Sequence, residues 1–161
     1  MFKSSNLFFI LFFTILISCQ KKKRNEITKE KSWEYIELAT RSQRITVYKF
    51  EDTASVEKEI YKKVGGEFIS AVYKLEKIER KNFKINKTER DSLYNFVFKL
   101  LTKPTFTDKA ATDYAGYIKI KLKDRNTTLM CEYQSVGEWS TISPETKKIY
   151  ALINPKAELP K

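Results

Sequence analysis

The sequence has 161 residues, with 31 Lys and Arg against 20 Asp and Glu, a formal net charge of +11, and 42% hydrophobic residues. This length suits one domain, and so much apolar material offsets the entropy of ordering the chain, so wholesale disorder is not expected. The chain contains no histidine, which excludes Ser-His-Asp triads, Cys-His pairs and imidazole metal ligands. With Cys19 and Cys131 alone it has too few cysteines for a disulfide framework or a four-thiolate zinc site.

The N-terminus has the pattern of an export signal. Lys3 lies in a short polar opening, and an apolar stretch of 11 residues follows from Leu7 to Ile17. A membrane-spanning helix needs about 20 apolar residues, whereas the apolar part of a secretory signal needs only about 7–15. Residues 1–18 are therefore predicted to be a signal peptide.

The end of this segment, Leu16-Ile17-Ser18-Cys19, resembles the lipobox of bacterial lipoproteins: an aliphatic residue, a tolerant position, a small residue and a cysteine. The resemblance is confined to the N-terminal segment. It implies cleavage between Ser18 and Cys19, transfer of a diacylglyceryl group to the Cys19 thiol, and often acylation of the new amine, commonly by palmitate. Two or three acyl chains anchor a protein stably, so the resemblance implies a lipid-anchored envelope protein.

Residues 19–32 are predicted to form a tether between the lipidated cysteine and a single domain at 33–161. After Cys19 the tether has one aliphatic residue, Ile27, and no large aromatic, so it cannot pack a core. Four basic residues lie beside the anchor: Lys21, Lys22, Lys23 and Arg24. Each gains up to about 1 kcal/mol at an anionic membrane surface, or the four serve only as a solubilising spacer.

The residue after Cys19 bears on whether the lipoprotein is sorted to the inner or the outer membrane. Lipoproteins of enterobacteria retained in the inner membrane commonly carry Asp at this position, and this chain has Gln20. Surface export in some bacterial groups uses acidic residues here, whereas this chain has basic ones. For a source with two membranes, the expectation is the outer membrane, with the domain facing the periplasm.

The first part of the domain predicts strands. Residues 33–50 favour two strands around a polar turn at 41–43, because aromatic and β-branched residues flank it. Aliphatic residues then recur at four-residue spacing: Val56, Ile60 and Val64. This spacing predicts a short helix that stops at Gly65-Gly66. The same glycines alternatively predict a two-residue hairpin turn between strands 59–64 and 67–75, and both alternatives stay open.

The strongest predicted element is a helix over about 87–102. One apolar stripe recurs at helical spacing: Leu93, Phe96, Val97, Leu100 and Leu101. Asn86 followed by Glu89 resembles a capping box, and Pro104 prevents the helix from continuing. The stripe is expected to pack in the core.

A strand pair and a last helix complete the domain. Residues 117–123 alternate apolar and polar, and 124–126 supply turn residues before a second strand that contains Cys131 as a buried, inert thiol. Ser143-Pro144-Glu145 predicts the start of a short helix over about 144–153, ended by Asn154-Pro155. Together the elements predict an α+β fold with helices on one face of a mostly antiparallel sheet.

No motif for nucleotide, metal or calcium binding is present, so neither a cofactor nor a metal is expected. The outer ends of the predicted hairpin gather aromatic and acidic residues that form a candidate partner-binding patch: Asp113, Tyr114, Tyr117, Glu138 and Trp139. Packing of the same aromatics in the core is the alternative. Asp113 and Glu138 are also the residues that an acid/base hydrolase would use.

The sequence favours a non-catalytic envelope protein that binds a macromolecular partner, as an inhibitor or immunity-type factor or as an accessory subunit. A small carboxylate hydrolase and a structural spacer on anionic lipid are the alternatives. The row Lys119, Lys121 and Lys123 is compatible with nucleic-acid binding, but an exported, membrane-tethered protein rarely meets nucleic acid, so no such partner is expected. The sequence leaves the oligomeric state open.

Overall fold

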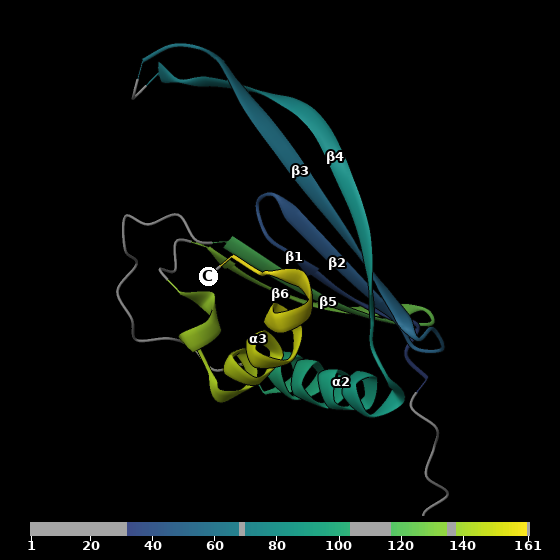
Figure 1. Ribbon diagram of the computed structural model, residues 1–161. Coiled ribbons are helices and arrows are strands. Elements are labelled where there is room, and N and C mark those ends of the chain that lie inside the picture. The colour runs from purple at the N-terminus through teal and green to yellow at the C-terminus, as the bar shows by residue number, and fades with distance from the viewer. Residues whose placement is uncertain (1–31, 68–69, 104–116, 135–137, 161) are drawn as a thin grey trace, which may run out of the picture. The chain divides into compact units, whose positions relative to one another are not determined.

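Six antiparallel strands form one sheet in the computed structural model, which describes residues 32–67, 70–103, 117–134 and 138–160. The strands lie in the order β4-β3-β2-β1-β5-β6 (Figure 1). Their bounds are β1 Tyr35–Ala39, β2 Gln43–Tyr48, β3 Thr53–Gly65, β4 Val72–Lys84, β5 Tyr117–Asp124 and β6 Thr127–Gln134. The described residues belong to one compact unit that begins at Ser32.

Two helices cover one face of the sheet (Figure 1). They are α2 (Lys87–Thr102) and α3 (Pro144–Ala157), and a single 3₁₀ turn, η2 (Trp139–Thr141), precedes α3. The core between the layers contains fully buried side chains from every layer: Ile36, Leu38, Ile45, Leu93, Ile120 and Ile149. The predicted α+β class, with a mostly antiparallel sheet, is confirmed.

The predicted strand pairs at 33–50 and 117–133 are confirmed. β1 and β2 join through a tight turn in which the Gln43 amide donates to Thr40 Oγ1 at 3.1 Å. β5 and β6 join at Arg125, whose positive φ of 45° closes a short turn. On β5 the predicted inward residues are buried: Ile118, Ile120 and Leu122.

The helix α2 begins and ends where the sequence predicts. Asn86 Oδ1 accepts from the backbone N–H of Glu89 at 2.9 Å, and the backbone N–H of Asn86 donates to Glu89 Oε2 at 2.9 Å. The capping box is therefore complete. Three residues of the predicted stripe are fully buried: Leu93, Val97 and Leu100. The stripe therefore packs in the core, as expected.

The helix predicted after residue 55 is wrong, and two paired strands occupy this region as the hairpin alternative expected, although with other bounds. β3 ends at Gly65 and β4 begins only at Val72, so the predicted two-residue turn at Gly65-Gly66 is wrong as well. Val56 pairs with Ile45 of β2, so a partner strand distant in sequence overrides the local four-residue spacing. Gly66 opens the loop at φ +78°, where an added Cβ would lie 2.0 Å from the Ser70 carbonyl oxygen.

The predicted end of α3 at Ile153 is also wrong, because the helix continues through Pro155 to Ala157. A proline near the end of a helix removes only one backbone hydrogen bond. The additional turn is held by tertiary contacts, since Gln43 Nε2 donates to the Ala157 carbonyl at 2.6 Å. Glu158, at φ +47°, then closes the helix by donating its amide to Asn154.

A buried guanidinium connects the β2–β3 turn to the start of α2. Arg90 Nη1 lies 2.6 Å from the Glu51 carbonyl, 2.8 Å from the Ile85 carbonyl and 2.7 Å from Asp52 Oδ1. The Arg90 side chain is 8% exposed, whereas that of Asp52 is 87% exposed. The two carbonyl contacts therefore carry most of the stabilisation.

Replacing Arg90 with Ala leaves the buried Ile85 carbonyl and the partly buried Glu51 carbonyl without this donor, and we expect a loss of about 2–4 kcal/mol in the free energy of unfolding. Asp52→Ala is the matched control, with a much smaller loss, because its carboxylate is in water. Urea denaturation of the two variants measures both losses. Equal losses would show that the ion pair, instead of the carbonyl contacts, supplies the stability.

Candidate partner-binding arm

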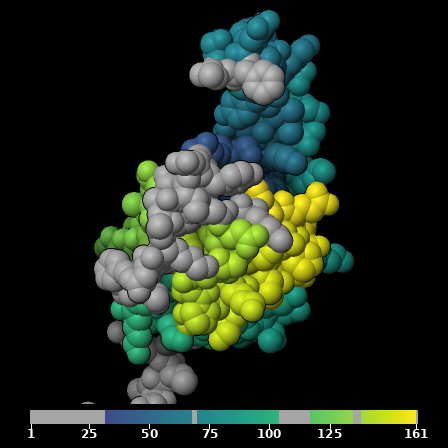
Figure 2. All heavy atoms as spheres, turned by 90° about the vertical axis from the view of Figure 1, so that its left-hand side faces the viewer, coloured from purple at the N-terminus to yellow at the C-terminus, as the bar shows by residue number. Residues whose placement is uncertain are grey.

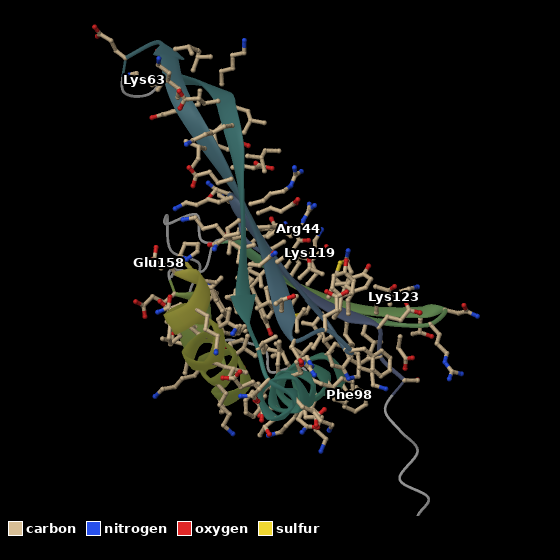
Figure 3. All side chains as sticks on the ribbon, turned by 45° about the vertical axis from the view of Figure 1, so that its right-hand side comes forward. Arg44, Lys63, Phe98, Lys119, Lys123 and Glu158 are labelled. Atoms are coloured by element: carbon tan, nitrogen blue, oxygen red, sulfur yellow. The ribbon has the colours of Figure 1, made fainter. Side chains whose placement is uncertain are left out.

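The β3–β4 hairpin is longer than the strand beside it. β3 and β4 each have 13 residues, but β2 pairs only with residues 54–58 of β3. Glu59 donates its amide to Ser42 in the β1–β2 turn, and beyond it the hairpin has no other strand beside it in the described part of the chain. We call residues 60–65 and 72–78 the arm. It rises clear of the body in Figures 1 and 2, and Lys63 lies near its end in Figure 3.

The arm has one apolar face. Directly paired residues of an antiparallel hairpin point to the same side, and Tyr61 pairs with Leu75, Lys63 with Tyr73, and Glu59 with Ile78. This face also carries Glu59 and Lys63, and we call it the apolar face for its four large side chains that are 43–61% exposed: Tyr61, Tyr73, Leu75 and Ile78. Tyr61 Oη donates to Glu59 Oε2 at 2.5 Å, which holds its ring against this face.

The opposite face of the arm is basic. There Lys62 pairs with Lys74, and Ile60 pairs with Lys77. Lys77 Nζ lies 2.6 Å from Glu79 Oε1, and the carboxylate raises the pKa of the Lys77 ammonium. The arm is therefore amphipathic across its two faces while both faces stay exposed.

A pocket of about 210 Å³ lies below the arm, between the sheet-paired part of the β3–β4 hairpin and the end of α3. Its apolar lining includes Val56, Phe83 and Ala157, and its charged lining includes Lys58, Lys81 and Glu158. Small-molecule sites usually measure about 300–1,000 Å³. This pocket is instead of a size that accepts one or two side chains of a partner.

The face of the sheet opposite the helices is covered by ion pairs. Lys121 Nζ lies 2.9 Å from Glu37, and Lys119 Nζ lies 3.1 Å from Glu132, whose carboxylate raises the pKa of Lys119. Figure 3 shows Lys119 and Lys123 on this side of the sheet, away from the helices. Two lysines of the row that the sequence analysis considered for nucleic acid are therefore paired with glutamates of neighbouring strands.

The same face carries a second set of charges on strands β2, β3 and β4. Arg44, also labelled in Figure 3, lies 3.9 Å from both Glu37 and Glu57. Arg80 Nε lies 2.8 Å from Glu57 Oε1, and this contact lowers the pKa of the Glu57 carboxyl. Charges of opposite sign thus alternate from β4 across to β5.

The structure describes three residues of the predicted aromatic patch: Tyr117, Glu138 and Trp139. Asp113 and Tyr114 lie outside the described residues, Tyr117 is half-buried at the start of β5, and Glu138 is exposed. Trp139 is 1% exposed, and its Nε1 donates to the Pro160 carbonyl at 2.9 Å. Trp139 therefore belongs to the core, which is the packing role that the sequence left as an alternative.

The predicted anchor and its basic neighbours also lie outside the described residues: Ser18, Cys19, Lys21, Lys22, Lys23 and Arg24. Within the residues that are described, no helix is long and apolar enough to cross a membrane. The same residues hold no group of three or more metal-ligating side chains.

Sequence reasoning missed the arm as a site. The alternation of Tyr73, Leu75 and Lys74 along β4 signals a strand with one apolar face, but apolar faces of strands normally point to a core. The arm is exposed because β2 begins only at Gln43 and pairs with no residue of β3 beyond Lys58, which no local pattern reveals.

Comparisons with known proteins find no matching family model, no similar curated protein and no similar solved structure.

Cys131 is a free thiol whose side chain packs against the core from β6. Burial raises its pKa from 9.0 to about 11, and hydrogen bonds with Tyr133 and the Ile120 backbone only partly oppose this. The neutral thiol is the stable form at neutral pH, as expected for an inert packing residue.

Alkylation of the folded protein by iodoacetamide should follow this pKa. We expect the rate at Cys131 to rise with a midpoint near pH 11 in the folded chain and near 9.0 in urea. Since the raised pKa favours the thiol, ionisation in the unfolded state should lower stability as pH rises from 9 towards 11. A folded-state midpoint at or below 9.0 would show that Cys131 is activated instead.

Proposed function

We propose that this chain is a membrane-anchored lipoprotein of the cell envelope whose domain binds a macromolecular partner through the apolar face of the arm. The observation that carries the proposal is that face: Tyr61, Tyr73, Leu75 and Ile78 are exposed together on a projecting hairpin. Monomeric proteins rarely leave a contiguous apolar surface of this kind uncovered unless it contacts another molecule.

The arm is suited to binding because its backbone is already ordered. Cross-strand pairing runs to Gly65 and Val72, so binding fixes few additional backbone dihedrals. Fully burying one large apolar side chain contributes about 1.5–3 kcal/mol, so four such residues supply several kcal/mol before the cost of association. Tyrosines are also frequent among the residues that dominate binding energies at interfaces.

The lipid anchor that the sequence predicts on Cys19 also supports the proposal. A lipid on Cys19 would confine the domain to the membrane, where a tethered binder meets a membrane-bound partner at high effective concentration. An inhibitor or immunity-type factor and an accessory subunit of an envelope complex both fit this arrangement. The outer membrane, with the domain facing the periplasm, is the proposed location in a source with two membranes.

Intact-mass measurement of the membrane-extracted protein tests the anchor. The native chain should begin at Cys19 and weigh more than the cleaved polypeptide by a diacylglyceryl group and an acyl chain, because both are attached to that residue. Cys19→Ser should carry no lipid and should remain uncleaved. A native mass equal to that of an unmodified chain contradicts the anchoring proposal.

Site-specific photo-cross-linking in the native envelope tests the arm. A photoreactive residue in place of Tyr73 should give one dominant cross-linked species, because this ring lies on the proposed interface. The matched control is the same residue in place of Phe50, which is 80% exposed at the β2–β3 turn but outside the arm, and it should not give that species. Adding Tyr61→Ser and Leu75→Ser should abolish the cross-link at 73.

Circular dichroism of the Tyr61→Ser, Leu75→Ser chain should be unchanged, because neither side chain contributes to the core. Equal cross-linking at positions 50 and 73, or a cross-link at 73 that survives the two serines, would contradict binding through the apolar face.

A further inference from the structure

β4 forms one edge of the sheet, and its outer side has no neighbouring strand in the described part of the chain. An unpaired edge presents backbone N–H and C=O groups that another strand can bind. The opposite edge strand, β6, has a single charged residue, Glu132. β4, in contrast, has a dense series of charges: Lys74, Glu76, Lys77, Glu79, Arg80, Lys81 and Lys84.

The charges of β4 are self-complementary about Ile78. Glu76 and Arg80 lie two residues from it on either side, and Lys77 and Glu79 lie one residue from it. When two copies of one strand pair antiparallel about a two-fold axis, residues equidistant from the axis face each other. A two-fold axis at Ile78 would therefore place Glu76 opposite Arg80 and Lys77 opposite Glu79. The symmetry repeats each of these pairs once.

Most other registers of the same strand oppose like charges, and an axis at Leu75, which avoids them, aligns only residues 72–78 and has one kind of opposite-charge pair, Lys74 with Glu76. An axis at Lys77 places Lys74 opposite Arg80 and Lys77 opposite itself, and an axis at Glu79 places Lys77 opposite Lys81 and Glu79 opposite itself. With the axis at Ile78, no like charges face each other anywhere from Val72 to Lys84. Directly opposed like charges destabilise a strand pair, so the charge pattern favours the axis at Ile78, which aligns the whole strand and gives two kinds of opposite-charge pair.

We propose that two copies of this chain pair antiparallel through the outer edges of β4, centred on Ile78, and so join two sheets into one. The β-bulge that leaves Glu76 out of the register with β3 bends the strand towards its tip, so residues 76–80 carry the contact. Arg80, which contacts Glu57 of its own chain, would also meet Glu76 of the second copy. The second copy binds the edge of β4 and meets Ile78, so the other three residues of the apolar face, Tyr61, Tyr73 and Leu75, stay available to another partner. Either proposal can therefore fail without the other.

Cysteine cross-linking of the full chain in its native membrane tests the register. In a Cys131→Ser background, Ile78→Cys should form a disulfide-linked dimer under mild oxidation, because residue 78 faces its own counterpart. Lys74→Cys is the matched control: it would lie about 27 Å from its counterpart, eight residues away at about 3.4 Å each, and should not link. The Cys131→Ser parent measures any dimer formed through Cys19. No linkage above the parent at position 78, or equal linkage at 74, overturns the proposal.

Charge exchange gives a second, independent test. The dimer dissociation constant of the detergent-extracted chain should rise at least about tenfold for Glu76→Arg and for Arg80→Glu, since each replaces two attractive pairs by repulsive ones. The double variant should return to within about threefold of the original chain, because the pairs are restored with their signs exchanged. Lys63→Glu, on the arm but outside the contact, should leave the constant unchanged. A monomeric original chain, or no recovery in the double variant, overturns the proposal.

Discussion

The organisation of the domain depends on a mismatch in strand length. β2 begins at Gln43, directly after the turn whose Ser42 carbonyl accepts from the Glu59 backbone N–H, whereas β3 and β4 continue together well past that point. Each strand of the arm therefore satisfies one side of its backbone with the other strand and leaves the opposite side to solvent. A two-stranded hairpin alone is only marginally stable in water. The arm persists because its base belongs to a six-stranded sheet whose inner face is buried under α2 and α3.

The described body of the domain exposes fewer large apolar side chains than the arm. On the helix side, the core is closed by Leu93, Ile149 and Trp139, and on the other side glutamates of β1, β3 and β6 pair with Lys121, Arg44, Arg80 and Lys119. Such partly exposed pairs contribute modestly to stability, but they make a surface whose charges already have partners. Exposed large apolar side chains are instead concentrated on the arm, where the proposed function places the interface.

Local patterns in the sequence were sufficient where each element is stabilised by its own neighbours. The Asn86–Glu89 capping box and the alternation of Ile118, Ile120 and Leu122 each act within a few residues, and both predictions are confirmed. The residues around Val56 were ambiguous, because pairing with β2 decides between helix and strand. Trp139 could be read as a surface anchor or as core, and only the tail contact with Pro160 decides. The arm was missed for the same reason: its exposure results from the absence of a neighbouring strand.

The proposed function requires that the apolar face of the arm is covered in the native envelope. Hydroxyl-radical footprinting of tyrosines, read by mass spectrometry, measures this directly on the intact chain. Tyr61 and Tyr73 should be labelled several-fold more slowly in native membranes than in the purified protein, while Tyr48, 42% exposed in the body of the sheet, should be labelled at the same rate in both. Equal labelling of Tyr61 and Tyr73 in the two preparations would contradict the account.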